Sequence, residues 1–281
     1  MSREERDLVI RRILVALDTS AHSRAALEAA AELAAQFHAE LFGLFVEDVN
    51  LLRLTQLPFT REVGLYSARP RQLRTHEVER HLRAQAQRVR RLLRTVAQRA
   101  ELRWSFDVAR GRTVDELLRA AREVDMIILG RRGRTVIRPG RLGSTARAMV
   151  TSAPSMTLLL HEGSCLGAPI MVVYDGSTIG QRAVAAAASL ALSRESALTI
   201  LLADGQEDVG RLRDEAQGQL ADREVRARYV ALTASTAARL AHAVRTEGCG
   251  VLVLPATTAL LRREELLGLV AEAELPILLV R

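Results

Sequence analysis

The stretch Ile13-Leu-Val-Ala-Leu-Asp-Thr-Ser20 leads directly into an alanine-rich segment that ends at Phe37. Its first five residues are apolar, which is typical of a strand buried on both faces of a parallel sheet. The segment Ser20–Phe37 carries apolar residues at helical spacing, so we expect a helix there. A strand, a tight turn and a helix form the unit from which parallel α/β sheets are built.

The same alternation of strands and helices continues to about residue 160. A long helix is predicted from about Thr75 to Ala100, and its arginines lie mostly off the apolar face, which indicates a solvated surface. The preceding segment Leu51–Arg74 reads as irregular. Its apolar part, up to Tyr66, is either a ligand lid or partner surface, or it packs over the sheet. The remaining elements predicted here are strands at Leu41–Val46, Arg103–Ala109, Met126–Leu129 and Met156–Leu160, and helices at Thr113–Arg122 and from about Ser144.

The rest of the chain repeats this order. Val15-Ala-Leu-Asp-Thr-Ser20 corresponds to Val172-Val-Tyr-Asp-Gly-Ser177 at an offset of 157, and Met126–Leu129 corresponds to Val251–Leu254 at an offset of 125. This duplication predicts two tandem Rossmann-like or flavodoxin-like α/β domains, residues 1–162 and 168–281, each with an open parallel sheet of about five strands. The second set of predicted elements is strands at Ile170–Tyr174, Ala197–Leu202, Glu224–Val230, Gly250–Leu254 and Ile277–Val280, and helices at Thr178–Ser193, Glu207–Ala221, Ser235–Glu247 and Arg262–Ala271.

The composition excludes several classes of protein. With 281 residues, of which 48% are hydrophobic and 26% charged, the chain fits a two-domain globular protein and not a disordered one. It has no apolar run of the ~18 residues that cross a bilayer, and no apolar signal region follows its charged first residues. Two cysteines, Cys165 and Cys249, are too few for a disulfide framework or a structural zinc site. We therefore expect a cytoplasmic location and no membrane span.

The distribution of charge argues against a nucleic-acid partner. All 40 basic residues are arginine, which excludes a lysine nucleophile, a Schiff base and a Walker-type phosphate-binding lysine. Up to Glu162 the chain has 28 arginines and 19 acidic residues, whereas beyond it 12 arginines face 14 acidic residues. An evenly basic nucleic-acid surface would not divide in this way, and only nine aromatic residues are present to stack on bases.

The loop after the strand Met126–Leu129 carries the chemistry. Its small residues are Gly130, Gly133, Gly143 and Ser144. The first two glycines let the backbone approach a ligand closely. Gly143-Ser144 begins the next helix, where unpaired N–H groups and the positive end of the dipole favour a phosphate. The arginines of this loop, which either neutralise phosphate charge or are solvated surface charges, are Arg131, Arg132, Arg134, Arg138 and Arg141. Open α/β sheets bind ligands at the carboxyl ends of their strands, so we predict a phosphate site here.

This loop resembles the nucleotide-binding motif of the universal stress protein family, which is glycine, two residues, glycine, nine residues, glycine and then serine or threonine. The resemblance extends over nearly the whole chain, as two tandem domains. It implies a site for ATP, or for AMP or ADP, in which Asp18 reaches the ribose and phosphates, with Mg²⁺ nearby, and the backbone of Val46 holds the adenine. The nucleotide-binding residues that it implies are Ala16, Leu17, Asp18, Val46, Leu129, Gly130, Arg131, Gly133, Gly143, Ser144 and Thr145.

The second copy departs from this motif. At the offset of 125, Gly130, Gly133, Gly143 and Ser144 become Pro255, Thr258, Gly268 and Leu269. Pro255 lacks an N–H group and Leu269 offers no hydroxyl, so this copy is not expected to hold a triphosphate, although Asp175 matches Asp18. We interpret its role as structural. The resemblance implies that the two domains pair within the chain through Met156–Leu160 and Ile277–Val280, and leaves open whether two chains dimerise further.

The resulting hypothesis is a stress-response regulator whose bound adenine nucleotide changes the surface shown to an unidentified protein partner. Two alternatives stay open, a slow ATP hydrolase and a nucleotide-free interaction module. We find no nucleophile, base and orienting group in sequence, and interpret His22 as a partly exposed polar residue, so turnover is not expected. Asp18 and Asp175 have a second interpretation as helix caps, a role that Thr19 or Ser20 can also fill in the first copy.

Overall fold

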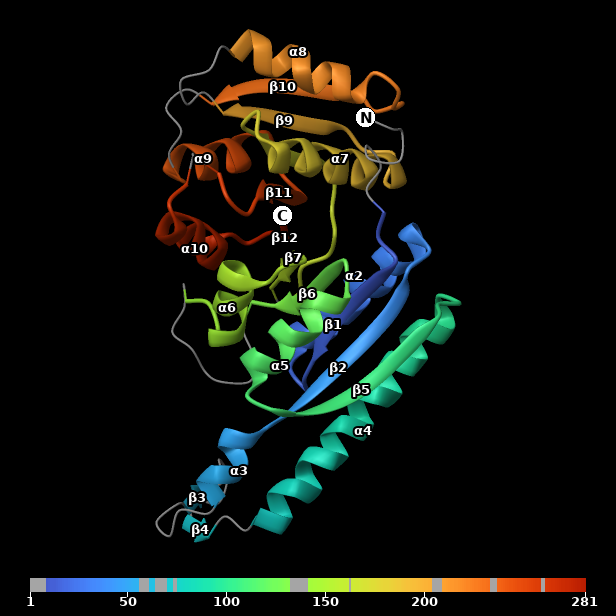
Figure 1. Cartoon of the computed structure of the whole chain (residues 1–281), viewed down its shortest axis with the longest axis vertical. Coiled ribbons are helices and arrows are strands. Elements are labelled where there is room, and N and C mark those ends of the chain that lie inside the picture. Colours follow the sequence, from blue (N-terminus) through green and yellow to red (C-terminus); the bar gives the residue numbers. More distant parts are fainter. Residues whose placement is uncertain are drawn as a thin grey trace.

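The computed structural model describes residues 9–55, 61–63, 70–72, 75–131, 141–161, 163–203, 209–232, 237–258 and 261–281. Its frame is a ten-stranded sheet that runs through both halves of the chain (Figure 1). The strands of the first half are β1 (Arg12–Leu17), β2 (Glu40–Asp48), β5 (Trp104–Gly111), β6 (Met126–Gly130) and β7 (Met156–Leu160). Those of the second half are β8 (Ile170–Tyr174), β9 (Leu198–Ala203), β10 (Ala227–Leu232), β11 (Val251–Pro255) and β12 (Ile277–Val280).

The order of the strands across the sheet is β5-β2-β1-β6-β7-β12-β11-β8-β9-β10. Within each half all neighbours are parallel, and the order reverses between β1 and β6 and again between β8 and β11. Such a reversal is the switch point at which open α/β sheets bind ligands. The two halves meet where β7 and β12 pair antiparallel, with Leu158 opposite Leu278. The predicted fold class, two tandem open parallel-sheet domains, is confirmed.

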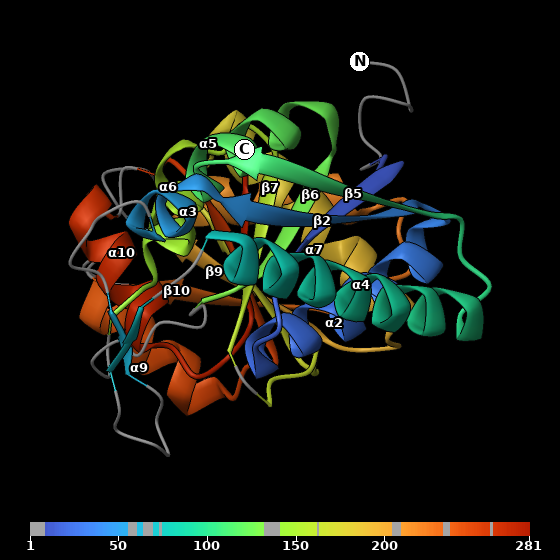
Figure 2. The same cartoon turned by 90° about the horizontal axis from the view of Figure 1, so that it is seen from below.

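Helices cover both faces of this sheet (Figure 2). One face is packed by α2 (Ala21–Phe37), α4 (Thr75–Arg99), α7 (Thr178–Ser193) and α8 (Val209–Leu220). The other is packed by α5 (Thr113–Ala120), α6 (Ser144–Ser152), α9 (Ala237–Glu247) and α10 (Arg263–Glu272), and the 3₁₀ turn η1 (Ala121–Glu123) follows α5. Strands β7 and β8 are buried at every residue, which explains their uninterrupted apolar sequences. No helix in the described part of the chain has the length and apolarity needed to cross a bilayer.

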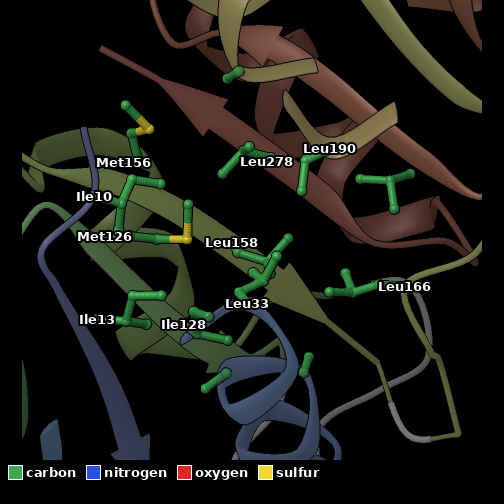
Figure 3. Close-up of a cluster of buried hydrophobic side chains, with 14 of the residues drawn as sticks. Ile10, Ile13, Leu33, Met126, Ile128, Met156, Leu158, Leu166, Leu190 and Leu278 are labelled. Atoms are coloured by element: carbon green, nitrogen blue, oxygen red, sulfur yellow. The ribbon is translucent and has the colours of Figure 1, made fainter. Parts of the chain in front are cut away.

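One hydrophobic cluster continues across the junction of the halves (Figure 3). Leu158 of β7 and Leu278 of β12 lie at its centre, with Leu33 of α2 on one side and Leu190 of α7 on the other, and each is at most 3% exposed. Burying one such leucine contributes about 2 kcal/mol. The halves therefore share a core and are not two bodies joined by a linker alone.

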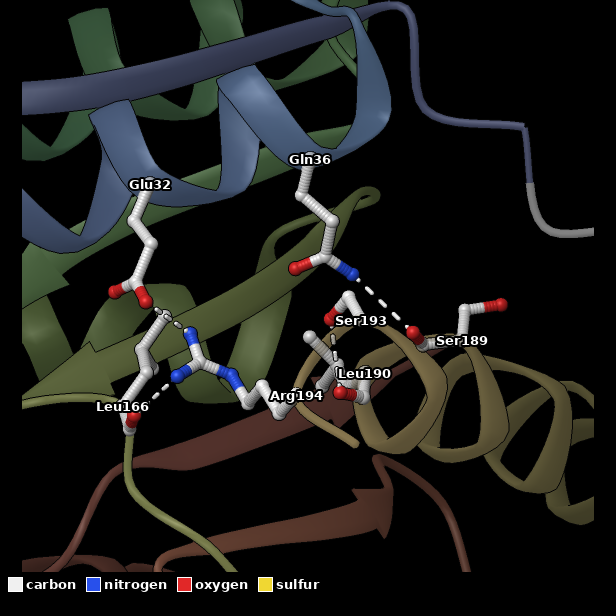
Figure 4. A network of polar contacts seen from close by, with 7 residues as sticks. All are labelled: Glu32, Gln36, Leu166, Ser189, Leu190, Ser193 and Arg194. Atoms are coloured by element: carbon white, nitrogen blue, oxygen red, sulfur yellow. Dashed lines mark hydrogen bonds and ion pairs between the residues drawn. The ribbon is translucent and has the colours of Figure 1, made fainter. Parts of the chain in front are cut away.

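Polar contacts on one face of the sheet join the halves as well (Figure 4). Arg194, at the end of α7, forms an ion pair with Glu32 of α2 at 2.7 Å and donates to the carbonyl of Leu166. Gln36 donates from the same helix to the carbonyl of Ser189 at 3.2 Å. Because Glu32 is 51% exposed, water screens the pair, and its main effect is on how α2 and α7 align.

The segment Leu51–Arg74 is not irregular throughout, so that prediction is wrong for its described parts. Helix α3 (Val49–Thr55) follows β2 without a break, and Asp48 accepts a hydrogen bond from the N–H of Asn50 at 2.8 Å. Farther on, β3 (Arg61–Val63) and β4 (Pro70–Gln72) pair antiparallel. A helix this short, started by its own capping aspartate, is too brief to register as helical periodicity. Half of the candidate lid up to Tyr66, residues 56–60 and 64–66, lies outside the described residues.

Candidate functional site

A cavity of about 640 Å³ opens where β1, β2 and β6 end, at the switch point of the first half. Its volume lies within the range of about 300–1,000 Å³ that is usual for small-molecule sites. The structure thus brings together residues that are more than 120 positions apart in sequence. The predicted site residues that line the cavity are Ala16, Leu17, Asp18, Val46, Leu129, Gly130, Arg131, Gly143, Ser144 and Thr145. Gly133 and the loop arginines Arg132, Arg134 and Arg138 lie outside the described residues, and Arg141 is exposed.

The end of β1 is held rigid by the start of α2. The Asp18 carboxylate accepts hydrogen bonds through Oδ1 from the N–H of Ser20, at 2.8 Å, and from its hydroxyl. Ser20 is the N-cap of α2 and accepts from the N–H of Ser23 at 3.1 Å. The Ser23 hydroxyl in turn accepts from the N–H of Asp18 at 2.9 Å. Ser20 therefore caps the helix, and Asp18 orients that cap while it lines the cavity.

The opposite wall is formed by the end of β6 and the start of α6. The N–H of Arg131 donates to the carbonyl of Leu160 at 2.7 Å, which continues the pairing of β6 with β7. The carbonyl of Arg131 accepts from the N–H of Gly143 at 2.9 Å. Gly143 is the N-cap of α6 and has no side chain with which to cap the first turn. The first turn also contains no acidic residue. The positive end of the helix dipole is consequently presented to the cavity, which suits an anion.

The side chain of Arg131 is engaged with the second half. Only 6% of the residue is exposed, and Nη1 donates to the carbonyl of Val270, in the last turn of α10, at 2.8 Å. A cation at this end of a helix is stabilising. The guanidinium therefore ties the cavity wall to α10, a role that the sequence had not indicated for it.

Several lining residues were missed by sequence reasoning. Asp48, at the end of β2, accepts from the Thr113 hydroxyl at 3.3 Å, which fixes the start of α5 against the cavity. Gln85 of α4 is 7% exposed and lies 2.7 Å from the imidazole of His81. A signal for Gln85 was present, since it is a polar residue inside the apolar stripe of α4. The other lining residues not predicted include Ser20, Ser23, Asn50, Leu82 and Arg112, whereas Leu51, which also lines the cavity, begins the segment considered as a lid.

The position in the second half that corresponds to Leu17 is occupied by a tyrosine. Tyr174 stands where the first half has Leu17, is 1% exposed, and donates through its hydroxyl to Glu215 of α8 at 3.0 Å. Burial, followed by the contact with Glu215, raises the pKa of Tyr174 well above its ordinary 10.0. Gly180 stands where the first half has Ser23, and a Cβ there would lie 2.5 Å from Asp175 and 3.3 Å from the tyrosine ring. A side chain at this position would therefore have to displace the Asp175 carboxylate from its contacts with Ser177.

Asp175 keeps the local role that Asp18 has. Its Oδ1 accepts from the N–H of Ser177 at 3.1 Å and from the Ser177 hydroxyl at 2.6 Å, and Ser177 caps α7 by accepting from the N–H of Gly180 at 2.9 Å. The capping interpretation of this aspartate thus agrees with its contacts. The motif after the first strand of each half is in part a device for starting the first helix.

The constant offset of 125 between the halves does not hold beyond Pro255. Gly268 and Leu269 lie inside α10, and the residue that begins this helix as Gly143 begins α6 is Arg262. The connection 256–262 is shorter than its counterpart 131–143, so the helix starts sooner than a fixed offset predicts. In α10 the Glu265 carboxylate accepts from the N–H of Arg262 at 2.8 Å. A carboxylate thus lies at the helix start where the first half presents only backbone.

Comparisons with known proteins show the family from the sequence and the fold from solved structures. Residues 10–161, more than half of the chain, match the model of the universal stress protein family. A universal stress protein from Archaeoglobus fulgidus is similar over 95% of this chain and 97% of its own, with a TM-score of 0.70 and 15% identity. A protein of unknown function from Pseudomonas aeruginosa is similar over 99% and 94%, with a TM-score of 0.56 and 16% identity. At these identities the likeness shows the fold alone. No curated protein matches the chain.

Proposed function

The chain belongs to the universal stress protein family, and on this premise we propose that its first half binds an adenine nucleotide, ATP or else ADP or AMP, in the cavity between β1, β2 and β6. The phosphates would lie on the backbone at Gly130 and at the start of α6. The adenine would lie against Val46, and Asp18 would face the ribose and phosphates.

One observation carries this proposal: the start of α6 opens into the cavity without a capping side chain. The other helices that follow a first or fourth strand differ from it. Ser20 caps α2 and Ser177 caps α7, and the start of α10 carries the carboxylate of Glu265, which accepts from the N–H of Arg262. Unpaired N–H groups at a helix start are anion-binding groups, so a phosphate is the ligand chemistry that this helix end favours.

Asp18 suits a place near the ribose and a nucleotide-bound Mg²⁺. Its two hydrogen bonds from Ser20 fix the carboxylate, and a fixed carboxylate is preorganised as a ligand. Among the described residues no group of three or more metal-ligating side chains is found. Mg²⁺ would therefore be held mainly by the phosphates with Asp18 as one protein ligand, an arrangement that is usual for this ion.

For the second half we propose a structural role, with the domains divided between residues 162 and 168. Tyr174 takes up the space that is open beside Leu17, and Glu265 places negative charge at the start of α10. Both features oppose a triphosphate there. The half instead supplies β12, which continues the sheet from β7, and helices that cover the junction.

We propose further that nucleotide occupancy alters the surface offered to a protein partner, so that the protein acts as a regulator in the stress response. The cavity lies beside α3 and the first half of α4, since Asn50, Leu82 and Gln85 line it. A ligand there would contact these elements directly. A cytoplasmic location is part of this proposal, because adenine nucleotides are abundant in that compartment.

The test is a carboxylate placed where the phosphates are proposed to lie. Ser144→Asp puts negative charge on the first residue of α6, a position at which aspartate stabilises a helix, so folding should be preserved. Thr178→Asp makes the matched change on the first residue of α7. Calorimetric titration with ATP should show the affinity of Ser144→Asp reduced about tenfold or more, with Thr178→Asp unchanged. Equal affinities for all three proteins would reject the site.

A further inference from the structure

The far end of α6 is held by the second half of the chain. Arg281, directly after β12, donates through Nη2 to the carbonyls of Met149 at 3.0 Å and Val150 at 2.7 Å. Arg263, at the start of α10, donates to the carbonyl of Thr151 at 3.2 Å. Three consecutive carbonyls in the last turns of α6 thus accept hydrogen bonds from arginines of the other half. Cations at this end of a helix offset the negative end of its dipole.

Arg281 also fixes the turn that follows α6. Its Nη1 donates to the carbonyl of Ser155 and to the hydroxyl of Thr157, both at 3.1 Å. Thr157 is fully buried in β7, and burial lowers the pKa of Arg281 to about 10. One planar guanidinium therefore donates to four acceptors of the first half, which lie in α6, in the turn after it and in β7. A lysine ammonium has no such fork and could not meet this arrangement.

A reciprocal contact holds the other side of the phosphate-binding elements. Arg131 follows β6, and its carbonyl accepts from the N–H of Gly143, the residue that begins α6. Its guanidinium reaches Val270 in α10. In the pairing of β7 with β12, Leu158 lies opposite Leu278, so these two strands match at an offset of 120. At the same offset, Val270 in α10 corresponds to Val150 in α6. The last turn of each of these helices thus receives an arginine from the opposite half.

We propose that the second half positions the phosphate-binding end of the cavity through Arg281, with Arg131 as its reciprocal, so that Arg281 is a positioning residue for the nucleotide phosphates. The nine-residue helix α6 connects the cavity with Arg281. Its first turn lines the cavity, and its last turn is anchored by Arg281. A helix this short transmits a shift at one end to the other. This inference rests on the proposed nucleotide site.

The experiment compares ATP with adenosine in three variants. Arg281→Met removes the donors while keeping much of the buried stem, and Arg281→Lys keeps the charge. Arg194→Met is the matched control, because it removes an arginine that joins the halves on the other face of the sheet, at Glu32 and Leu166. The expected result is an ATP affinity about five- to tenfold weaker in both Arg281 variants. Adenosine, which has no phosphate, should bind within about twofold of the original chain.

A second measurement does not depend on nucleotide. Amide hydrogen exchange at the start of α6 is followed at Gly143 and Arg147, whose N–H groups donate to the carbonyls of Arg131 and Gly143, and it should become about tenfold faster in Arg281→Met and stay unchanged in Arg194→Met. ATP affinity that is unaltered, or that falls together with adenosine affinity, would overturn the positioning role. A parent chain that binds neither ligand would instead reject the proposed site. In that case unaltered exchange in Arg281→Met would also reject the anchoring of α6.

Discussion

The switch points of the two halves are built alike and filled differently. In the first, Leu17 leaves a cavity whose opposite wall is an uncapped helix start. In the second, Tyr174 reaches across to Glu215, and α10 begins after a shorter loop with its own capping carboxylate. Strand order, the aspartate after the first strand and the serine cap are common to both. The comparison shows that the two switch points differ by one larger side chain and one shorter loop, both placed at the carboxyl ends of the strands.

Removing the tyrosine should give the largest effect on folding. Tyr174→Ala deletes a fully buried ring and leaves Glu215 without its phenol donor, so we expect the free energy of unfolding to fall by about 4 kcal/mol. Leu17→Ala, at the matching position, should lower it by only about 2 kcal/mol, because that side chain already borders a cavity. Urea denaturation of both variants provides the comparison. Equal losses would show that the two crevices are packed alike.

The same tyrosine should make stability sensitive to alkaline pH. The pKa of Tyr174 is raised in the folded chain, so the folded state keeps the phenolic proton longer than the unfolded state. The stabilisation is therefore complete below the ordinary pKa of 10.0 and is lost as the pH rises above it, by about 1 kcal/mol per pH unit. The free energy of unfolding should fall less between pH 8 and pH 11 in Tyr174→Phe than in the parent chain. An identical fall in both proteins would contradict the assignment.

The two serine caps should separate stability from ligand binding. Ser20→Ala and Ser177→Ala each remove a helix N-cap, and each should lower the free energy of unfolding by about 1 kcal/mol. In the first half the Ser20 hydroxyl also orients Asp18. ATP affinity measured by titration should thus fall in Ser20→Ala by about threefold and remain constant in Ser177→Ala. A loss in both variants would mean that ligand affinity merely follows stability.

The smallest effect is expected at the surface contact between the halves. Glu32→Gln removes the charge that pairs with Arg194, yet Glu32 is half-exposed, so the change in unfolding free energy should be about 0.5 kcal/mol or less. Thermal unfolding at low and high salt measures it. A larger loss would show that water screens this ion pair less than its exposure implies.

Regular elements could be predicted closely because their signals are local. The strands Met156–Leu160, Ile170–Tyr174 and Ile277–Val280 and the helix Thr178–Ser193 have the predicted limits, since buried strands and amphipathic helices are written in hydrophobic spacing. Helix α3 was not predicted because it is short and begins with a capping aspartate, so it has no helical periodicity to detect. The pairing of Gly143 with Gly268 failed because a fixed offset cannot account for a loop of different length.

The residues of the candidate site likewise include some that the sequence predicted and some that it did not. Ten of the predicted residues line one cavity because the carboxyl ends of parallel strands meet at one edge of a sheet, a rule that needs only the order of elements. Asp48 was missed although the same rule covers the end of β2. Gln85 and Arg112 were not placed at the cavity in advance, since their part in it depends on how α4 and α5 lie over that edge, which the polar break in the stripe of α4 does not specify.

By itself the sequence determined the duplication, the alternation of strands and helices, and the loop whose glycines and helix start suit a phosphate, because each depends on residues close together in the chain. Only the tertiary structure decided that Tyr174 meets Glu215, that Arg131 reaches α10 and that Arg281 holds α6. These contacts span 41, 139 and 131 residues, respectively. The two arginine contacts exist because β7 and β12 pair antiparallel and bring the last helix of each half beside the other, and the tyrosine contact exists because α8 packs on the same sheet face as α7; no local preference specifies either arrangement.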